Sequence, residues 1–190
     1  MEHLGTKRLE TDRLVLRQFT MADADAMYRN WACDPEVTKY LRWPHHASVE
    51  VSRDVLRDWT SHYAEPGFYN WAIVLKENGP EPIGSIGVVE RDDAIRMVHI
   101  GYCLGRRWWR QGIMTEALAA MLQFFFGQVG VNRVESRHDP RNPNSGRVMQ
   151  ACGMRYEGTH RQDDWSNQGI CDSVWYAILA KDGPPPDVLV

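Results

Sequence analysis

Three arginines precede a glycine in a segment that joins a predicted strand to a predicted helix. The segment, residues 106–112, reads Arg-Arg-Trp-Trp-Arg-Gln-Gly. The N–H groups at the start of a helix have no intrahelical partner and carry partial positive charge. Glycine lets a ligand approach the backbone, and the arginines add full charges. We therefore predict a diphosphate site here, with an ordinary helix start bearing solvated arginines as the alternative.

Two common nucleotide-binding motifs do not fit this segment. The spacing is not that of the P-loop, G-x-x-x-x-G-K-[ST], and no G-x-G-x-x-G follows the first predicted strand. A nucleotide-binding protein that uses the arginine-rich segment is therefore a weak hypothesis.

Five short motifs in a fixed order give the chain a family resemblance that covers roughly residues 9–181. It resembles the GNAT acetyltransferases, in which [QR]-x-x-G-x-[GA] binds the pyrophosphate of acetyl-CoA, and among them the ribosomal-protein N-acetyltransferase branch (the RimJ/RimL type). The motifs are T-x-R-L-x-L-R at 11–17, I-G-S-I-G at 83–87, I-G-Y at 100–102, W-x-x-G-x-x-T-E-A at 109–117, and D-x-x-N-x-x-S at 139–145 with Gly153-Met154 after it. Three residues depart from the family pattern: Trp109, Met114 and His99.

The resemblance implies that acetyl-CoA is the co-substrate. Its candidate binding residues are Cys103, Leu104, Arg107, Trp109, Arg110, Gln111, Gly112, Ile113, Met114, Thr115 and Asn142.

The resemblance also implies that an amine attacks the thioester directly. The amine must lose a proton, the oxyanion must be stabilised, and the thiolate must leave. His99 and Glu90 are the candidate bases, since an imidazole ionises near neutral pH and Glu90 ends the preceding strand. Ser145 is the candidate acid. The alternatives are a structural strand histidine, a solvated strand end, and a helix N-cap at Asn144-Ser145.

Trp43, His45 and Tyr69 lie in segments that wall the substrate groove of relatives, so they are the candidate substrate residues. The acceptor is predicted to be a protein N-terminus, as in the ribosomal-protein branch, or a small-molecule amine. A CoA-binding sensor or partner module without turnover is the alternative function.

The cysteines and histidines do not suggest a metal site or a disulfide framework. Cys33, Cys103, Cys152 and Cys171 are scattered, and the pair His45-His46 is too short to indicate a metal. We expect Cys103 to be a core residue and not a nucleophile.

Composition narrows the remaining possibilities. The 190 residues include 22 Lys plus Arg and 25 Asp plus Glu, a formal net charge of −3. This balance argues against nucleic-acid and membrane-surface partners, and no apolar run is long enough to span a bilayer. We expect a cytoplasmic monomer or homodimer. It would have a single acetyltransferase domain at 1–181 and a proline-rich tail at 182–190.

The hydrophobic periodicity supplies the elements that would position these residues. Its order is β-α-α-β-β-β-α-β-α-β-β, in which helix 112–126 joins strand 96–104 to strand 131–137. Strands joined through a helix run parallel. We predict an α+β fold of three layers: a mixed, mainly antiparallel sheet of about seven strands with helices on both faces.

Overall fold

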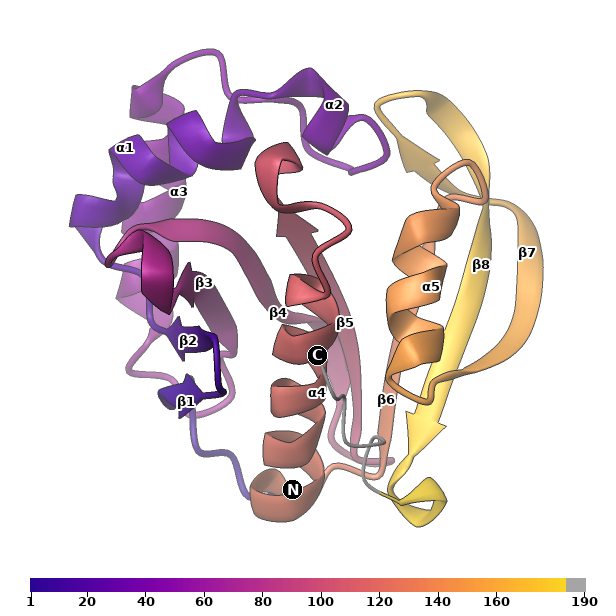
Figure 1. Ribbon diagram of the computed structural model, residues 1–190. Coiled ribbons are helices and arrows are strands. Elements are labelled where there is room, and N and C mark those ends of the chain that lie inside the picture. Colours follow the sequence, from indigo (N-terminus) through magenta and orange to yellow (C-terminus); the bar gives the residue numbers. More distant parts are fainter. Residues whose placement is uncertain (184–190) are drawn as a thin grey trace.

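A single mixed sheet organises the chain in the computed structural model, which describes residues 1–183 (Figure 1). The strand order is β1-β2-β3-β4-β5-β6-β8-β7. Neighbouring strands are antiparallel except β5 and β6, which are parallel as the helical connection predicts. The strands are β1 (Leu9–Glu10), β2 (Leu14–Arg17), β3 (Asn70–Leu75), β4 (Pro82–Asp92), β5 (Met97–Leu104), β6 (Arg133–His138), β7 (Arg155–Ser166) and β8 (Gly169–Leu179).

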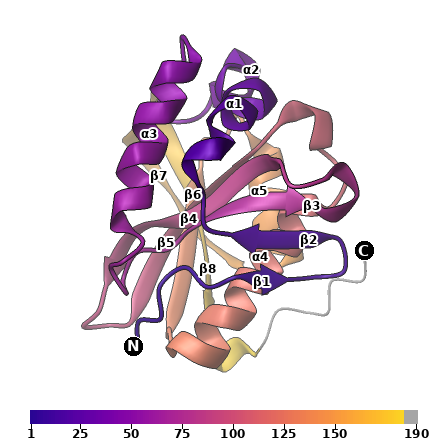
Figure 2. The ribbon, with the colours of Figure 1, turned by 90° about the vertical axis from the view of Figure 1, so that its left-hand side faces the viewer.

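Helices cover both faces of the sheet, as predicted (Figures 1 and 2). Two of them, α1 and α3, pack on one face, and α4 and α5 pack on the other. The helices are α1 (Ala24–Met27), α2 (Pro35–Thr38), α3 (Val49–His62), α4 (Ile113–Phe124) and α5 (Pro143–Ala151).

Each face has its own hydrophobic core. On one face the apolar side of α4, including Leu118 and Met121, packs with strand residues such as Trp71. On the other face Trp31 and Leu56 centre a smaller core. Side chains alternate along a strand, so a single strand contributes residues to both cores.

The sheet has eight strands and not about seven, because the first strand that the periodicity predicts, residues 9–19, is divided. The Thr11 N–H donates to the Leu14 carbonyl at 3.0 Å, and the Leu14 N–H donates to Thr11 Oγ1 at 2.9 Å. This turn splits the run into β1 and β2, which pair with each other. The polar residues 10–13, Glu-Thr-Asp-Arg, mark this break in the sequence.

The start of α5 also differs from the prediction. Asn142 is the N-cap residue and Pro143 the first helical residue, so Ser145 lies inside the first turn. The alternative prediction of an N-cap at Asn144-Ser145 was therefore wrong.

Of the predicted proline-rich tail, residues 184–190 lie outside the described residues. No helix among residues 1–183 has the length and apolar character needed to cross a membrane.

Candidate active site

β5 and β6 pair over a short stretch and then separate. Met97–His99 pair with Arg133–Glu135, and in the described chain no ladder joins the two strands beyond that point. Ser136 Oγ donates to the Ile100 carbonyl at 2.9 Å, just where the strands diverge. Residues 101–104 of β5 therefore have no strand partner on the side that faces β6.

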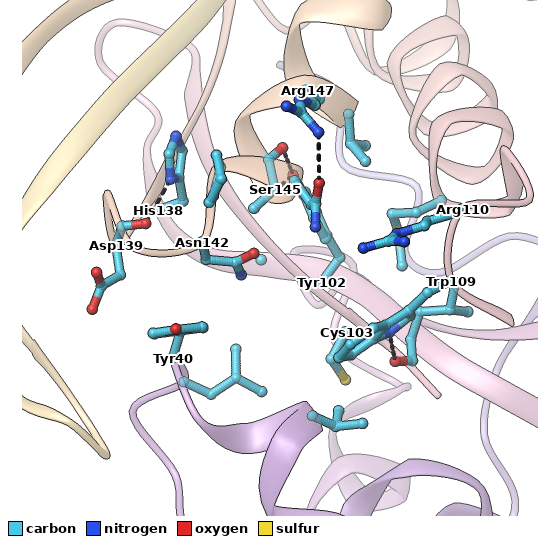
Figure 3. Close-up of a pocket in the computed structure, with 18 of the residues that line it drawn as sticks. Tyr40, Tyr102, Cys103, Trp109, Arg110, His138, Asp139, Asn142, Ser145 and Arg147 are labelled. Atoms are coloured by element: carbon cyan, nitrogen blue, oxygen red, sulfur yellow. Dashed lines mark hydrogen bonds between the residues drawn. The ribbon is translucent and has the colours of Figure 1, made fainter. Parts of the chain in front are cut away.

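Two cavities meet at this gap. The first, which we call the α4–α5 cleft, has a volume of about 590 Å³ and is lined by the starts of both helices (Figure 3). The second has a volume of about 550 Å³ and is lined by Met27 of α1, Trp59 of α3 and several other rings. We call it the aromatic pocket. Residues 101–103 and 137–139 line both cavities, so the two spaces adjoin at the gap between β5 and β6.

The N-terminal end of α4 opens into the α4–α5 cleft. Gly112 caps the helix with a φ of 74°, a left-handed conformation that favours glycine. The first helical hydrogen bond runs from the Glu116 N–H to the Gly112 carbonyl, so the N–H groups of residues 113–115 have no acceptor within the helix. These free donors lie at the positive end of the helix dipole, which makes this end of the cleft suited to an anion.

Two arginines add full charge to the same cleft. Arg110 precedes the helix, and Arg147 lies on α5, where its Nη1 donates to Asn144 Oδ1 at 3.0 Å (Figure 3). Arg110 has a φ of 61°, a left-handed conformation that costs residues with a Cβ about 1–2 kcal/mol. Such conformations are common where a loop is shaped for a ligand.

The turn between β1 and β2 holds α4 in place through Glu116. The carboxylate of Glu116 accepts hydrogen bonds from Thr11 Oγ1 at 2.5 Å and from Arg13 Nε at 2.7 Å. Arg13 also donates to the Gln111 carbonyl at 3.1 Å. Burial raises the pKa of Glu116, but the hydrogen bonds from Thr11 and Arg13 outweigh it and the pKa is lowered. The motif at 11–17 thus fixes the helix that presents the anion site.

A phenol and a hydroxyl face each other across the cleft. Ser145 Oγ donates to the Tyr102 hydroxyl at 3.1 Å, and that hydroxyl donates to the Ser145 carbonyl at 2.9 Å (Figure 3). Burial raises the pKa of Tyr102 well above its usual value, so the phenol stays protonated at neutral pH. Both O–H hydrogens are used in these two bonds, so Ser145 can donate to an anion in the cleft once its hydroxyl turns away from Tyr102.

His99 lies in the aromatic pocket beside a carboxylate. It is 5% exposed, and its Nδ1 lies 3.5 Å from Glu135 Oε1. The His99 ring, with help from Arg133, lowers the pKa of Glu135 against the opposing effect of burial. Glu135 is therefore ionised at neutral pH and stabilises a positive charge on the neighbouring imidazole.

Cys103 lies where the two cavities meet, but it is not activated. Its Sγ lies 3.2 Å from Ser85 Oγ, and burial raises the pKa of the thiol to about 11. The thiol is protonated at neutral pH, whereas the nucleophilic form is the thiolate.

All but one of the residues predicted to bind the cofactor line the α4–α5 cleft. The exception is Arg107, whose guanidinium lies 5.7 Å from the ring centroid of Trp108. Ser145 lines the cleft as well. The other lining residues from that prediction are Cys103, Leu104, Trp109, Arg110, Gln111, Gly112, Ile113, Met114, Thr115 and Asn142.

The predicted catalytic and substrate residues divide between the aromatic pocket and places outside it. His99 and Trp43 line the pocket. Glu90 is exposed on β4 just after a bulge, and His45 is exposed in a loop. Tyr69 is 1% exposed in the main core, where its hydroxyl accepts a hydrogen bond from the Leu4 N–H. Because these last three residues line neither cavity, we do not assign them to the site.

Sequence reasoning missed Tyr102, Arg147 and Glu135 as site residues. Tyr102 belongs to the I-G-Y motif and was the easiest to find. Arg147 follows Asn144 by three residues, which places both on one helix face. Glu135 is brought to His99 by the parallel pairing of β5 with β6, which no local pattern records.

In the described part of the chain, no group of three or more His, Cys, Asp or Glu is placed to hold a metal ion. All four cysteines are free thiols.

Comparison with known proteins identifies the class of enzyme. A family model described as an acetyltransferase (GNAT) domain matches residues 13–155. The uncharacterized N-acetyltransferase YoaA of Bacillus subtilis is 30% identical over 171 residues, covering 90% of this chain and 96% of that protein. The chain therefore belongs to the GNAT acetyltransferases and is an acetyl-CoA-dependent N-acetyltransferase.

The resemblance to the ribosomal-protein branch is also confirmed. The [ribosomal protein uS5]-alanine N-acetyltransferase of Escherichia coli is 28% identical over 188 residues, covering 94% of this chain and 93% of that protein. The fold matches the crystal structure of the ribosomal-protein-S5-alanine acetyltransferase from Vibrio fischeri with a TM-score of 0.81, at 19% identity, covering 94% of this chain and all of that one.

Proposed function

We propose that the protein transfers the acetyl group of acetyl-CoA to a primary amine that occupies the aromatic pocket, while acetyl-CoA occupies the α4–α5 cleft. The observation that carries this proposal is the meeting of the two cavities at residues 101–103. A thioester and an amine that enter from opposite faces of the sheet can meet there, beside main-chain groups that have no partner strand.

The residues of the α4–α5 cleft fit acetyl-CoA. The free N–H groups of residues 113–115, together with Arg110 and Arg147, suit its diphosphate. The open edge of β5 at residues 101–104 suits the amide groups of its pantetheine arm, which need hydrogen-bond partners along an extended path. Acetyl-CoA supplies the activated acyl group.

His99 is the proposed general base, and Glu135 positions it. A neutral imidazole in the aromatic pocket accepts the proton of the attacking amine, directly or through a water. The carboxylate of Glu135 then stabilises the imidazolium. His99 lies two residues before Gly101 on β5, so it is about 7 Å along the strand from the gap.

The other chemical needs fall to groups on the opposite side of the gap. Main-chain N–H groups of β5 near residues 102–104 are the proposed oxyanion donors. Ser145 is the proposed hydrogen-bond donor to the departing thiolate, after its hydroxyl turns away from Tyr102. The protonated thiol of Cys103 supports direct attack over an acyl-enzyme route.

The relative that acts on the alanine of ribosomal protein uS5 supports a protein N-terminus as the source of the amine, with a small-molecule amine as the alternative. We also propose that the protein is cytoplasmic, that it is a monomer or homodimer, and that it has no nucleic-acid partner.

Calorimetric titration with acetyl-CoA, CoA and ATP tests the cleft. Gly112→Asp places a negative charge at the anion site and is expected to weaken acetyl-CoA binding at least about 100-fold, since a like charge near a desolvated phosphate costs several kcal/mol. Gly112→Asn tolerates the left-handed conformation and separates charge from shape. Gly127→Asp, at an exposed glycine with open space around it, is the matched control.

Retained affinity in both the wild type and Gly127→Asp, with loss in Gly112→Asp, supports the cleft assignment. Preferential binding of ATP, or unchanged binding of acetyl-CoA to Gly112→Asp, contradicts it.

A further inference from the structure

Gly101 lies in β5 at the point where the two cavities adjoin. It lines both the α4–α5 cleft and the aromatic pocket. On one side it pairs with Gly87 of β4, and on the other side β6 has already separated from β5. Glycine weakens the interior of a strand, because it has no side chain to pack and loses more backbone entropy on folding than other residues. Its presence in this strand therefore costs stability.

The fold itself does not require glycine at position 101. The φ of Gly101 is not positive, so a residue with a side chain can adopt its backbone conformation. Apart from its chain neighbours, a Cβ atom here would meet one heavy atom of the described residues within 4 Å, Cγ2 of Val89 at 2.9 Å. Val89 is 62% exposed, so its side chain has room to turn away. Gly87 differs, because a Cβ atom there would lie 2.7 Å from the carbonyl oxygen of Tyr69.

A ligand is the remaining reason for this glycine. Glycine inside a strand often marks the close approach of a ligand to the backbone. The missing side chain would point toward Val89, which lines the aromatic pocket and not the α4–α5 cleft. Strand alternation places His99 and Cys103 on the same face, each about 7 Å along the strand from Gly101. The open space thus lies beside the proposed general base, where the amine is proposed to meet the thioester.

The surroundings of this space suit a short apolar chain. Val89 contributes a methyl group, and burial raises the pKa of the Cys103 thiol to about 11, so the thiol is uncharged. An uncharged thiol behaves as a small apolar group. Beyond these two side chains the space continues into the aromatic pocket, whose volume is about 550 Å³. An added methylene group would therefore be buried against apolar surface, which is favourable.

We propose that Gly101 is a specificity-determining residue for the acyl group: its missing side chain makes room for the acyl chain of the donor, and this room admits propionyl as well as acetyl groups. The inference rests on the proposed function and widens its donors to short-chain acyl-CoA thioesters. The chemistry is the same for both donors. The amine nitrogen bonds to the acyl carbon as the C–S bond breaks, His99 takes the proton of the amine, and CoA leaves as the thiolate.

Transfer kinetics with acetyl-CoA and propionyl-CoA test the proposal. The acceptors are a short peptide with an N-terminal alanine and spermidine, with release of the CoA thiol as the readout. We expect kcat/KM of the wild type for propionyl-CoA to lie within about tenfold of that for acetyl-CoA, because a site that excludes one methylene group discriminates by about 10–200-fold.

Variants on two sides of the space should shift the donor preference in opposite directions. Gly101→Ala fills the space, so the ratio of kcat/KM for propionyl-CoA to that for acetyl-CoA should fall at least about tenfold. Val89→Ala widens the space, so the same ratio should rise. Gly127→Ala, at an exposed glycine with open space around it, is the matched control and should leave the ratio unchanged.

Calorimetric binding of CoA, acetyl-CoA and propionyl-CoA separates this proposal from the proposed function. CoA has no acyl group, so its affinity should be the same in the wild type and in Gly101→Ala. If the wild type transfers neither acyl group while Gly101→Ala selectively weakens the binding of propionyl-CoA, the proposed function is overturned and the acyl space stands.

Three results would overturn the proposal itself. A wild-type preference for acetyl-CoA well above tenfold would exclude the wider range of donors. An unchanged donor ratio in Gly101→Ala would remove Gly101 as its determinant. Equal losses with both donors, together with a loss of CoA binding in Gly101→Ala, would show that the glycine is needed only for the structure.

Discussion

His99 combines burial with a charged partner at the residue scale. Its Nδ1 is a buried nitrogen without a hydrogen bond among the described residues, and the carboxylate of Glu135 lies 3.5 Å away. The Trp175 ring meets it edge-on at 5.3 Å between centroids. The Glu135 carboxylate and the Trp175 ring lie against the imidazole and fix its orientation, which a general base requires.

Replacing His99 by Gln should lower kcat about 100-fold, within the range that general bases contribute, and leave the KM for acetyl-CoA nearly unchanged. Steady-state transfer assays measure both constants. Equal activity of His99→Gln and wild type would remove His99 from the mechanism.

Replacing Cys103 by Ala should keep most of the activity, because the protonated thiol takes no chemical part. The same assays measure this variant, and a large loss of activity would favour an acyl-enzyme.

The sequence predicted the direction of the His99 side chain but not its neighbour. Strand alternation places His99 on the face opposite to Val98 and Ile100. Tyr69 was misplaced because its burial depends on the N-terminal segment, where the Leu4 N–H donates to its hydroxyl across 65 residues. A contact between residues so far apart in the chain leaves no pattern in the local sequence.

Among the elements, the β1–β2 turn near the N-terminus fixes the position of α4. Thr11 and Arg13 of this turn both donate hydrogen bonds to the carboxylate of Glu116, near the start of α4. The motif that suggested the family is therefore structural. It fixes the helix whose free N–H groups are proposed to hold the diphosphate.

Glu116→Ala should lower the free energy of unfolding by about 3 kcal/mol, because it leaves the Arg13 charge without its partner. It should also weaken acetyl-CoA binding. Glu81→Ala breaks an ion pair with Arg29 in which both side chains are 56% exposed, and should cost less than about 1 kcal/mol. Urea unfolding measures the free energy of unfolding of both variants. Equal losses would show that the contacts of Glu116 with Thr11 and Arg13 contribute no more than a surface ion pair.

Element order and the parallel pairing of β5 with β6 were predictable, because a helix between two strands fixes their direction. The β1–β2 hairpin was not predicted, although the polar residues 10–13 mark its turn. The separation of β5 from β6 depends on where the two strands stop pairing, which the sequence does not encode locally.

At the scale of the whole molecule, an ionised carboxylate on β7 joins the sheet to the loop after α2. Asp164 joins Arg42 of the loop after α2 to Arg137 of β6, and Asn167 donates to the Thr38 and Trp43 carbonyls. The β7–β8 hairpin thereby meets the segment around α2 above the gap (Figure 1). For Asp164, burial raises the pKa, but the Trp165 N–H and the two arginines outweigh it and the pKa is lowered.

Acid should therefore unfold the protein. The pKa values of Glu116, Glu135, Asp139 and Asp164 are all lowered in the folded state. The unfolded chain then binds protons first as the pH falls, so stability is fully present above a pH of about 4.5 and is lost below it. Circular dichroism melts from pH 7 to pH 3 measure this, and a Tm that stays constant down to pH 3 would contradict it.

The most direct test of the central claim is a crystal structure with acetyl-CoA bound. The account predicts the diphosphate at the N–H groups of residues 113–115 and the thioester at the gap beside residues 101–103, with the aromatic pocket left open to an amine. Acetyl-CoA that lies in the aromatic pocket, or a thioester that points away from the gap, would contradict the account.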